Sequence, residues 1–85
     1  MYHSDWTRED GFEQSIIYLF GTNSTTPIMK ARAVLNGEGT YNAIVRDYKS
    51  GRMVGSDTAP MRIEGAKKRS LEICRQLLRL EAMEN

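Results

Sequence analysis

The sequence has little of several residue types that would define a function at once. Its 85 residues include one cysteine, one histidine and one tryptophan. A single cysteine cannot form an internal disulfide, so we exclude a disulfide framework and expect a reducing, intracellular compartment. The lone histidine, His3, cannot supply the several ligands that a metal site needs. We therefore expect no metal and no cofactor.

The sequence also contains no recognisable catalytic motif and no segment that is typical of a membrane span. No nucleophile or carboxylate stands in a recognisable catalytic arrangement with the one histidine. No apolar run approaches the roughly 18 residues of a membrane span. The start of the chain, MYHSDWTRED, lacks the basic and apolar regions of a signal peptide. We expect a protein without enzymatic activity in the cytoplasm or the nucleus.

The composition that is present is that of one small globular domain. Hydrophobic residues make up 40% of the chain and charged residues 27%, which is ordinary for such a domain with one thin core. The net charge of +1 is too small for binding nucleic acid by overall charge, so any RNA contact must come from a local patch. We interpret residues 1–11 as a partly ordered N-terminal arm, residues 12–82 as the domain and residues 83–85 as a tail.

The segment FEQSIIYLF, residues 12–20, predicts the first helix of the domain. Phe12, Ile16, Leu19 and Phe20 fall on one helical face, and Gly21 is a typical helix stop. The same segment has a competing interpretation as a buried strand, because β-branched and aromatic residues crowd SIIYLF.

Three strands and a second helix are predicted after this segment. Residues 29–35 and 40–48 alternate between apolar and polar positions, and an Asn-Gly turn joins them. A third, short strand covers 52–56. A helix then begins near Thr58, its capping residue, with Pro60 in the first turn. Its apolar face, on which Cys74 becomes a core residue, consists of Ile63, Ala66, Ser70, Cys74 and Leu77.

This order of helix, three antiparallel strands and helix is a two-layer α+β sandwich, and it resembles the double-stranded-RNA-binding domain. QSIIYLFG stands where that family has its first helix, YNAIV and GRMVG resemble its second and third strands, and GAKKRSLEICRQLL resembles its last helix. The dimerisation domain of Dicer proteins shares most features, since there too a proline opens the last helix and Ala-Lys-Lys leads to Cys and Leu. The resemblance covers roughly residues 12–80 and implies a role in RNA silencing.

The surfaces with which that family binds duplex RNA are incomplete in this sequence. The loop between the first two strands, residues 36–40, has neither a histidine nor a proline. Ile63 and Glu64 stand where the family has two lysines. The remaining candidates for phosphate binding are Lys67, Lys68, Arg69 and Arg62. A solvated helix face is the alternative interpretation of the same cluster.

Aromatic residues indicate a second kind of surface. Trp6 lies in a polar segment, where it either folds back over the core or forms an exposed anchor, and Tyr18 and Phe20 are further candidates for binding a partner. Together with the resemblance, they favour a non-catalytic module for protein interaction or homodimerisation, with weak RNA contact. The alternatives are a direct double-stranded-RNA-binding domain and a phage-type small inhibitor with a sheet and one long helix.

Overall fold

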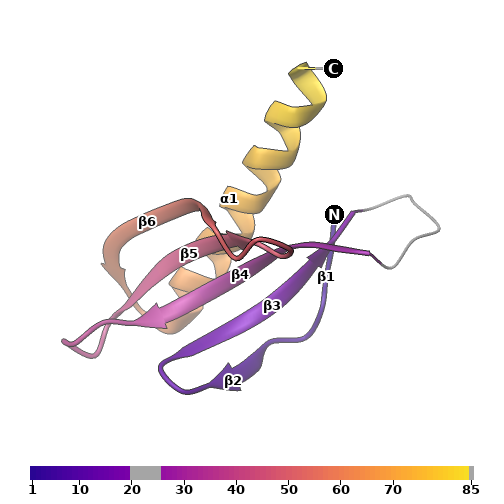
Figure 1. Ribbon diagram of the computed structural model, residues 1–85. Coiled ribbons are helices and arrows are strands. Elements are labelled where there is room, and N and C mark those ends of the chain that lie inside the picture. The colour runs from indigo at the N-terminus through magenta and orange to yellow at the C-terminus, as the bar shows by residue number, and fades with distance from the viewer. Residues whose placement is uncertain (20–25, 85) are drawn as a thin grey trace.

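The structure, a computed structural model, describes residues 1–19 and 26–84 and consists of one antiparallel sheet with one helix against it (Figure 1). The strands run in the order β1-β3-β4-β5-β6, and β2 also pairs with β3. Helix α1 contacts β4, β5 and β6, and its C-terminal part extends beyond the sheet. The bounds are β1 (Tyr2–His3), β2 (Thr7–Glu9), β3 (Phe12–Tyr18), β4 (Pro27–Leu35), β5 (Tyr41–Asp47), β6 (Met53–Met61) and α1 (Ile63–Glu84).

The predicted sandwich of helix, three strands and helix is wrong, because residues 12–18 form a strand. In β3 the buried residues Glu13, Ser15 and Ile17 alternate with half-buried ones, which is the period of a strand. β3 pairs with β4 on one side and with β1 and β2 on the other. This pairing on both edges and the β-branched residues outweigh the helical spacing of the apolar residues. The fold is α+β, and residues 1–19 and 26–84 form a six-stranded sheet and one C-terminal helix.

The segment that we interpreted as an N-terminal arm contributes two short strands to this sheet. Tyr2 pairs with Tyr18 in β1, and Thr7 pairs with Gln14 in β2. Between the two strands, the backbone nitrogen of Ser4 donates to the carbonyl of Ile16 at 2.9 Å. Residues 2–9 therefore cover the edge of β3, which would otherwise be an unpaired strand edge.

The predicted hairpin of residues 29–35 and 40–48 is confirmed, and its two strands are β4 and β5. In its turn the side chain of Asn36 accepts a hydrogen bond from the backbone nitrogen of Glu38 at 2.9 Å, and Gly39 adopts a φ of 82°. This φ lies in the left-handed region, which glycine enters without steric cost.

The third predicted strand is longer than expected, and the helix begins later. β6 continues to Met61, which pairs with Tyr41. The prediction that Thr58 caps the helix is therefore wrong, and α1 begins at Ile63. The predicted apolar face of α1 is confirmed by the complete burial of Ala66, Ser70 and Cys74.

The helix lies close to the sheet because the residues beneath it are small. Gly55 is the tightest point: a Cβ atom added there would lie 2.5 Å from Cγ2 of Ile73. Around it the sheet presents Ala31, Ala33 and Ala43, all fully buried. Burial raises the pKa of the Cys74 thiol to about 12, so this side chain stays protonated and acts as a small hydrophobic residue.

Candidate functional site

The structure separates the members of the basic cluster on α1. Lys67 Nζ lies 2.8 Å from Glu13 Oε1, and these two side chains are only 16% and 12% exposed. Arg69 Nε donates to Asp57 Oδ2 at 2.9 Å, and a second nitrogen of Arg69 lies 3.4 Å from Glu72. Lys68 and Arg62 are exposed to solvent. Carboxylates of β3, β6 and α1 therefore already neutralise Lys67 and Arg69.

Trp6 lies beside the ion pair between Glu13 and Lys67. Its ring is half-buried, packs against the hydrophobic core and lies 5.5 Å from Lys67 Nζ. The hydrogen bond from Lys67 lowers the pKa of Glu13, against the opposing effect of burial, and the same hydrogen bond raises the pKa of Lys67. Trp6 and Lys67, which the sequence indicated for different surfaces, thus share one structural cluster.

Tyr18 lies on the opposite side of the sheet, which we call the open face. In the described part of the chain, no helix or strand lies over this face (Figure 1). The strand alternation and the pairing registers place on it Phe12, Gln14, Ile16 and Tyr18 of β3, Lys30, Arg32 and Val34 of β4, Asn42, Ile44 and Arg46 of β5, and Ser56 of β6. Phe20, the other aromatic candidate, lies outside the described residues.

Three cations gather on the open face. Lys30 is directly opposite Arg46 in the pairing of β4 with β5, and Arg32 follows two residues along β4. Within residues 1–19 and 26–80, no carboxylate lies within ion-pairing distance of any of the three. Burial and the charge of Arg46 lower the pKa of Arg32, while Glu9 at the sheet edge acts in the opposite direction. The face therefore concentrates positive charge.

Neutral groups hold each of these cations in place. The Arg32 guanidinium lies 4.4 Å from the centre of the Phe12 ring, and its Nε donates to Gln14 Oε1 at 3.2 Å. Lys30 Nζ lies 5.3 Å from the centre of the Tyr48 ring. Arg46 donates to the carbonyl oxygen of Gly51 at 2.9 Å. None of these contacts cancels the charge.

Aromatic rings accompany the cations. Tyr2 is 60% exposed and packs beside Tyr18, with ring centres 5.8 Å apart. Tyr2, Tyr18, Phe12 and Tyr48 are four of the seven aromatic residues in the chain. Tyr2 is directly opposite Tyr18 in the pairing of β1 with β3, and Tyr48 contacts Lys30, so the rings lie on or beside the open face. Most of the aromatic residues of the chain are therefore close to cations that form no ion pair within residues 1–19 and 26–80.

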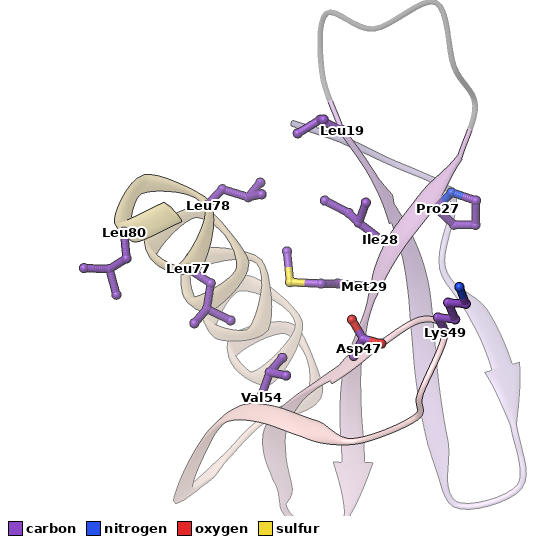
Figure 2. Close-up of a pocket in the computed structure, with 10 residues that line it drawn as sticks. All are labelled: Leu19, Pro27, Ile28, Met29, Asp47, Lys49, Val54, Leu77, Leu78 and Leu80. Carbon is purple, nitrogen blue, oxygen red and sulfur yellow. The ribbon is translucent and has the colours of Figure 1, made fainter. Parts of the chain in front are cut away.

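An apolar groove forms a second candidate surface, between the C-terminal part of α1 and the end of the sheet near Pro27 (Figure 2). Its volume is about 600 Å³. Asp47 lies at its border, and hydrogen bonds from the turn at Ser50 lower the pKa of this carboxyl. The apolar lining consists of Leu19, Pro27, Ile28, Met29, Val54, Leu77, Leu78 and Leu80.

The structure places His3 near two serines. Its Nδ1 lies 3.2 Å from the hydroxyl of Ser15, which is completely buried and donates to the carbonyl of Ser4. A buried hydroxyl of this kind is out of reach of a substrate. Among the described residues, no three histidine, cysteine or acidic side chains come together as metal ligands, and the described helix is too polar to span a membrane.

No protein-family model matches this chain, and neither a curated protein nor a solved structure is significantly similar to it. The function is therefore argued from the geometry of the two surfaces. The alternation of Lys30 and Arg32 in β4 was visible in the sequence as the polar side of a strand. That Lys30 lies opposite Arg46 depends on the register of β4 and β5. That Arg32 lies near Phe12 depends on residues 12–18 being a strand.

Proposed function

We propose that this protein is a non-catalytic module that binds the phosphate backbone of a nucleic acid through the open face of its sheet. The observation that carries this proposal is the group of Lys30, Arg32 and Arg46. Like charges opposite each other in a sheet are unfavourable, and within residues 1–19 and 26–80 no carboxylate forms an ion pair with any of the three. A polyanion laid across the face would supply the missing negative charge.

The layout of the three cations favours a polymer over one small anion. Lys30 and Arg32 are two residues apart on β4, a separation of about 7 Å, and Arg46 lies on the neighbouring strand. Each of the three contacts a different neighbour: Lys30 contacts Tyr48, Arg32 contacts Phe12 and Arg46 contacts Gly51. Cations spread in this way over two neighbouring strands suit successive phosphates of a chain. The small net charge of +1 agrees with binding by a local patch and not by the whole surface.

The proposal is tested by titrating the protein with an oligonucleotide of about 20 nucleotides at several salt concentrations. Three phosphate contacts give an expected slope of about −2 in log affinity against log salt for a single strand. The double substitution Lys30→Gln and Arg46→Gln should weaken binding about tenfold or more at low salt, because two of the three contacts are lost.

The matched control is the double substitution Arg62→Gln and Lys68→Gln, which removes two exposed cations from the helix side of the molecule. Its affinity should stay within about twofold of the wild type, since neither side chain belongs to the open face. An equal loss in both double variants would place the phosphate contacts on α1. Absence of binding by the wild-type protein at low salt would refute the proposal.

A second candidate function, protein interaction, is favoured by the apolar groove. Leu80 is 56% exposed and Val54 42% exposed, and both line the groove. The groove and the projecting Leu80 belong to one surface, as an interface between two identical copies requires. We propose homodimerisation through this surface as the alternative. Sedimentation across a concentration series tests it: Leu80→Glu should abolish a dimer, and a wild-type monomer at high micromolar concentration would exclude it.

A further inference from the structure

We infer that the ligand of the open face is a single-stranded nucleic acid whose bases stack on the aromatic side chains of this face. This inference rests on the proposed function, which requires phosphate contacts alone. It adds the strandedness of the ligand and the side chains that recognise it.

The first step concerns the positions of the rings. Phe12 and Tyr18 lie at the two ends of β3, about 20 Å apart at the rise of a strand. Arg32 and Lys30 lie opposite the residues between them, since Gln14 pairs with Arg32 and Ile16 pairs with Lys30. A strand laid along β3 and β4 would therefore meet rings at both ends and cations in the middle. This combination of aromatic stacking surfaces and positive charge is typical of single-strand binding.

The second step concerns the apolar residues beside the cations. Ile16 lies next to Lys30, and Ile44 lies next to Arg32, in the pairing registers. Both isoleucines are half-buried and take part in the surface of the open face. Contact with the phosphates of a duplex would leave these apolar groups against charged oxygens, which is unfavourable. Bases of a single strand present apolar faces that fit them.

The third step concerns the ring of Phe12 and the guanidinium of Arg32. Their separation of 4.4 Å places the cation over the ring, and the bond to Gln14 fixes its orientation. A fixed guanidinium offers a planar surface on which an unpaired base stacks. The bases of a duplex stack on one another inside the double helix, so they cannot stack on the Phe12 ring or on the Arg32 guanidinium. The local geometry therefore selects unpaired bases.

The experiment compares four probes by fluorescence anisotropy at one salt concentration: oligo-dT and oligo-rU of about 20 nucleotides, a duplex of the same length, and inorganic polyphosphate of similar charge. Both single strands should bind about tenfold more tightly than the duplex and the polyphosphate, since only they offer unstacked bases beside phosphates.

Two matched variants identify the rings. Tyr18→Leu removes a ring from the open face and should weaken binding of the single strands about tenfold, while affinity for polyphosphate stays unchanged. Tyr41→Leu removes a half-buried tyrosine from the other side of the sheet, where it pairs with Leu35 and Met61. It should leave all four affinities unchanged, with thermal unfolding followed for both variants to confirm that they fold.

The outcomes separate this inference from the proposed function. Equal affinity for single strand, duplex and polyphosphate would overturn the inference and leave the phosphate-binding function in place. Equal losses in Tyr18→Leu and Tyr41→Leu would likewise overturn it. If none of the four probes binds, both the inference and the proposed function fail.

Discussion

The two faces of the sheet use the same kinds of residue in opposite ways. On the face that α1 covers, Glu13 and Asp57 each pair with a cation of the helix within 3 Å, with Lys67 and Arg69 respectively. On the open face, Lys30, Arg32 and Arg46 are held by rings, an amide and a backbone carbonyl. The covered face therefore pairs its charges within the molecule, whereas the described carboxylates form no ion pair with the cations of the open face, where we propose that a ligand binds.

This difference shows that a run of basic residues in the sequence does not indicate which of them form ion pairs within the molecule. Lys67, Lys68 and Arg69 are adjacent in the sequence, yet Lys67 and Arg69 form ion pairs with carboxylates of the sheet. Arg32 and Arg46 are far apart in the sequence and come together only through strand register. The spatial partner of a cation decides its role, and the following substitutions test that division between the two faces.

The largest effect is expected from a charge placed under the helix. Cys74→Asp should prevent folding, because Cys74 is completely buried and an unpaired buried carboxylate costs several kcal/mol, a large share of the roughly 5–15 kcal/mol that stabilise a small domain. The control Arg75→Ala alters an exposed neighbour and should change the stability by less than about 0.5 kcal/mol. Thermal unfolding followed by circular dichroism measures both, and similar melting temperatures would contradict the orientation of α1.

The next effect concerns the ion pair of the covered face. Glu13→Gln should cost about 2 kcal/mol at neutral pH, less than the about 3–5 kcal/mol of a fully buried pair, because the two side chains keep some exposure. The folded-state pKa of Glu13 is lowered from 4.5. Its ionised form therefore contributes stability above pH 4.5, and this contribution is lost as the pH falls through the folded-state pKa.

Urea unfolding at a series of pH values checks this expectation. The wild type should lose stability more steeply than Glu13→Gln as the pH falls below about 4.5. Parallel profiles for the two proteins would show that Glu13 contributes nothing through its charge, and would break the contrast between the faces.

A third effect tests how closely α1 approaches the sheet. Gly55→Ala would place a methyl group 2.5 Å from Cγ2 of Ile73 and should destabilise the protein by about 1–3 kcal/mol, as overpacked cores do. Gly37→Ala is the control, since an added Cβ there meets no atom within 4 Å. Chemical denaturation of the two variants measures the difference, and equal midpoints would mean that the helix lies farther from β6.

The smallest effect on the free energy of unfolding is expected on the open face, where a substitution should stabilise the protein slightly instead of destabilising it. Lys30→Gln removes one of two like charges that lie directly opposite each other, so it should leave the stability unchanged or raise it by up to about 0.5 kcal/mol at low salt. Lys67→Gln on the covered face should instead destabilise, because it leaves Glu13 without its partner. Destabilisation of equal size by both substitutions would remove the distinction between the ion-paired cations of α1 and the cations for which we propose ligand binding.

Local patterns allowed part of this fold to be predicted. The alternation in residues 29–35, the Asn-Gly turn and the helical spacing from Ala66 to Cys74 each identified an element that the structure contains. The error at residues 12–18 came from the spacing of Phe12 and Ile16, which fits a helix. Pairing with both β4 and the N-terminal strands decided otherwise, and such long-range pairing is not visible in a local window.

The candidate site was harder to predict for the same reason. Tyr18 was identified as a partner-binding candidate, but its cationic neighbours on the open face depend on the registers of β3, β4 and β5. Because residues 12–18 form a strand, Glu13 lies within 2.8 Å of Lys67, a residue that the sequence indicated as a candidate phosphate contact. Ion pairs between distant segments follow from the topology and not from spacing along the chain.

The most direct test of the contrast between the faces follows isoleucine methyl groups by NMR during titration with a single-stranded oligonucleotide. Ile16 and Ile44 lie on the open face, whereas Ile17 and Ile73 are buried between the sheet and α1. Ile16 and Ile17 are neighbours in one strand and provide a matched pair. We expect large shifts for Ile16 and Ile44 and small ones for Ile17 and Ile73. Shifts confined to Ile73 and the residues around Lys67, with Ile16 and Ile44 unchanged, would contradict the account.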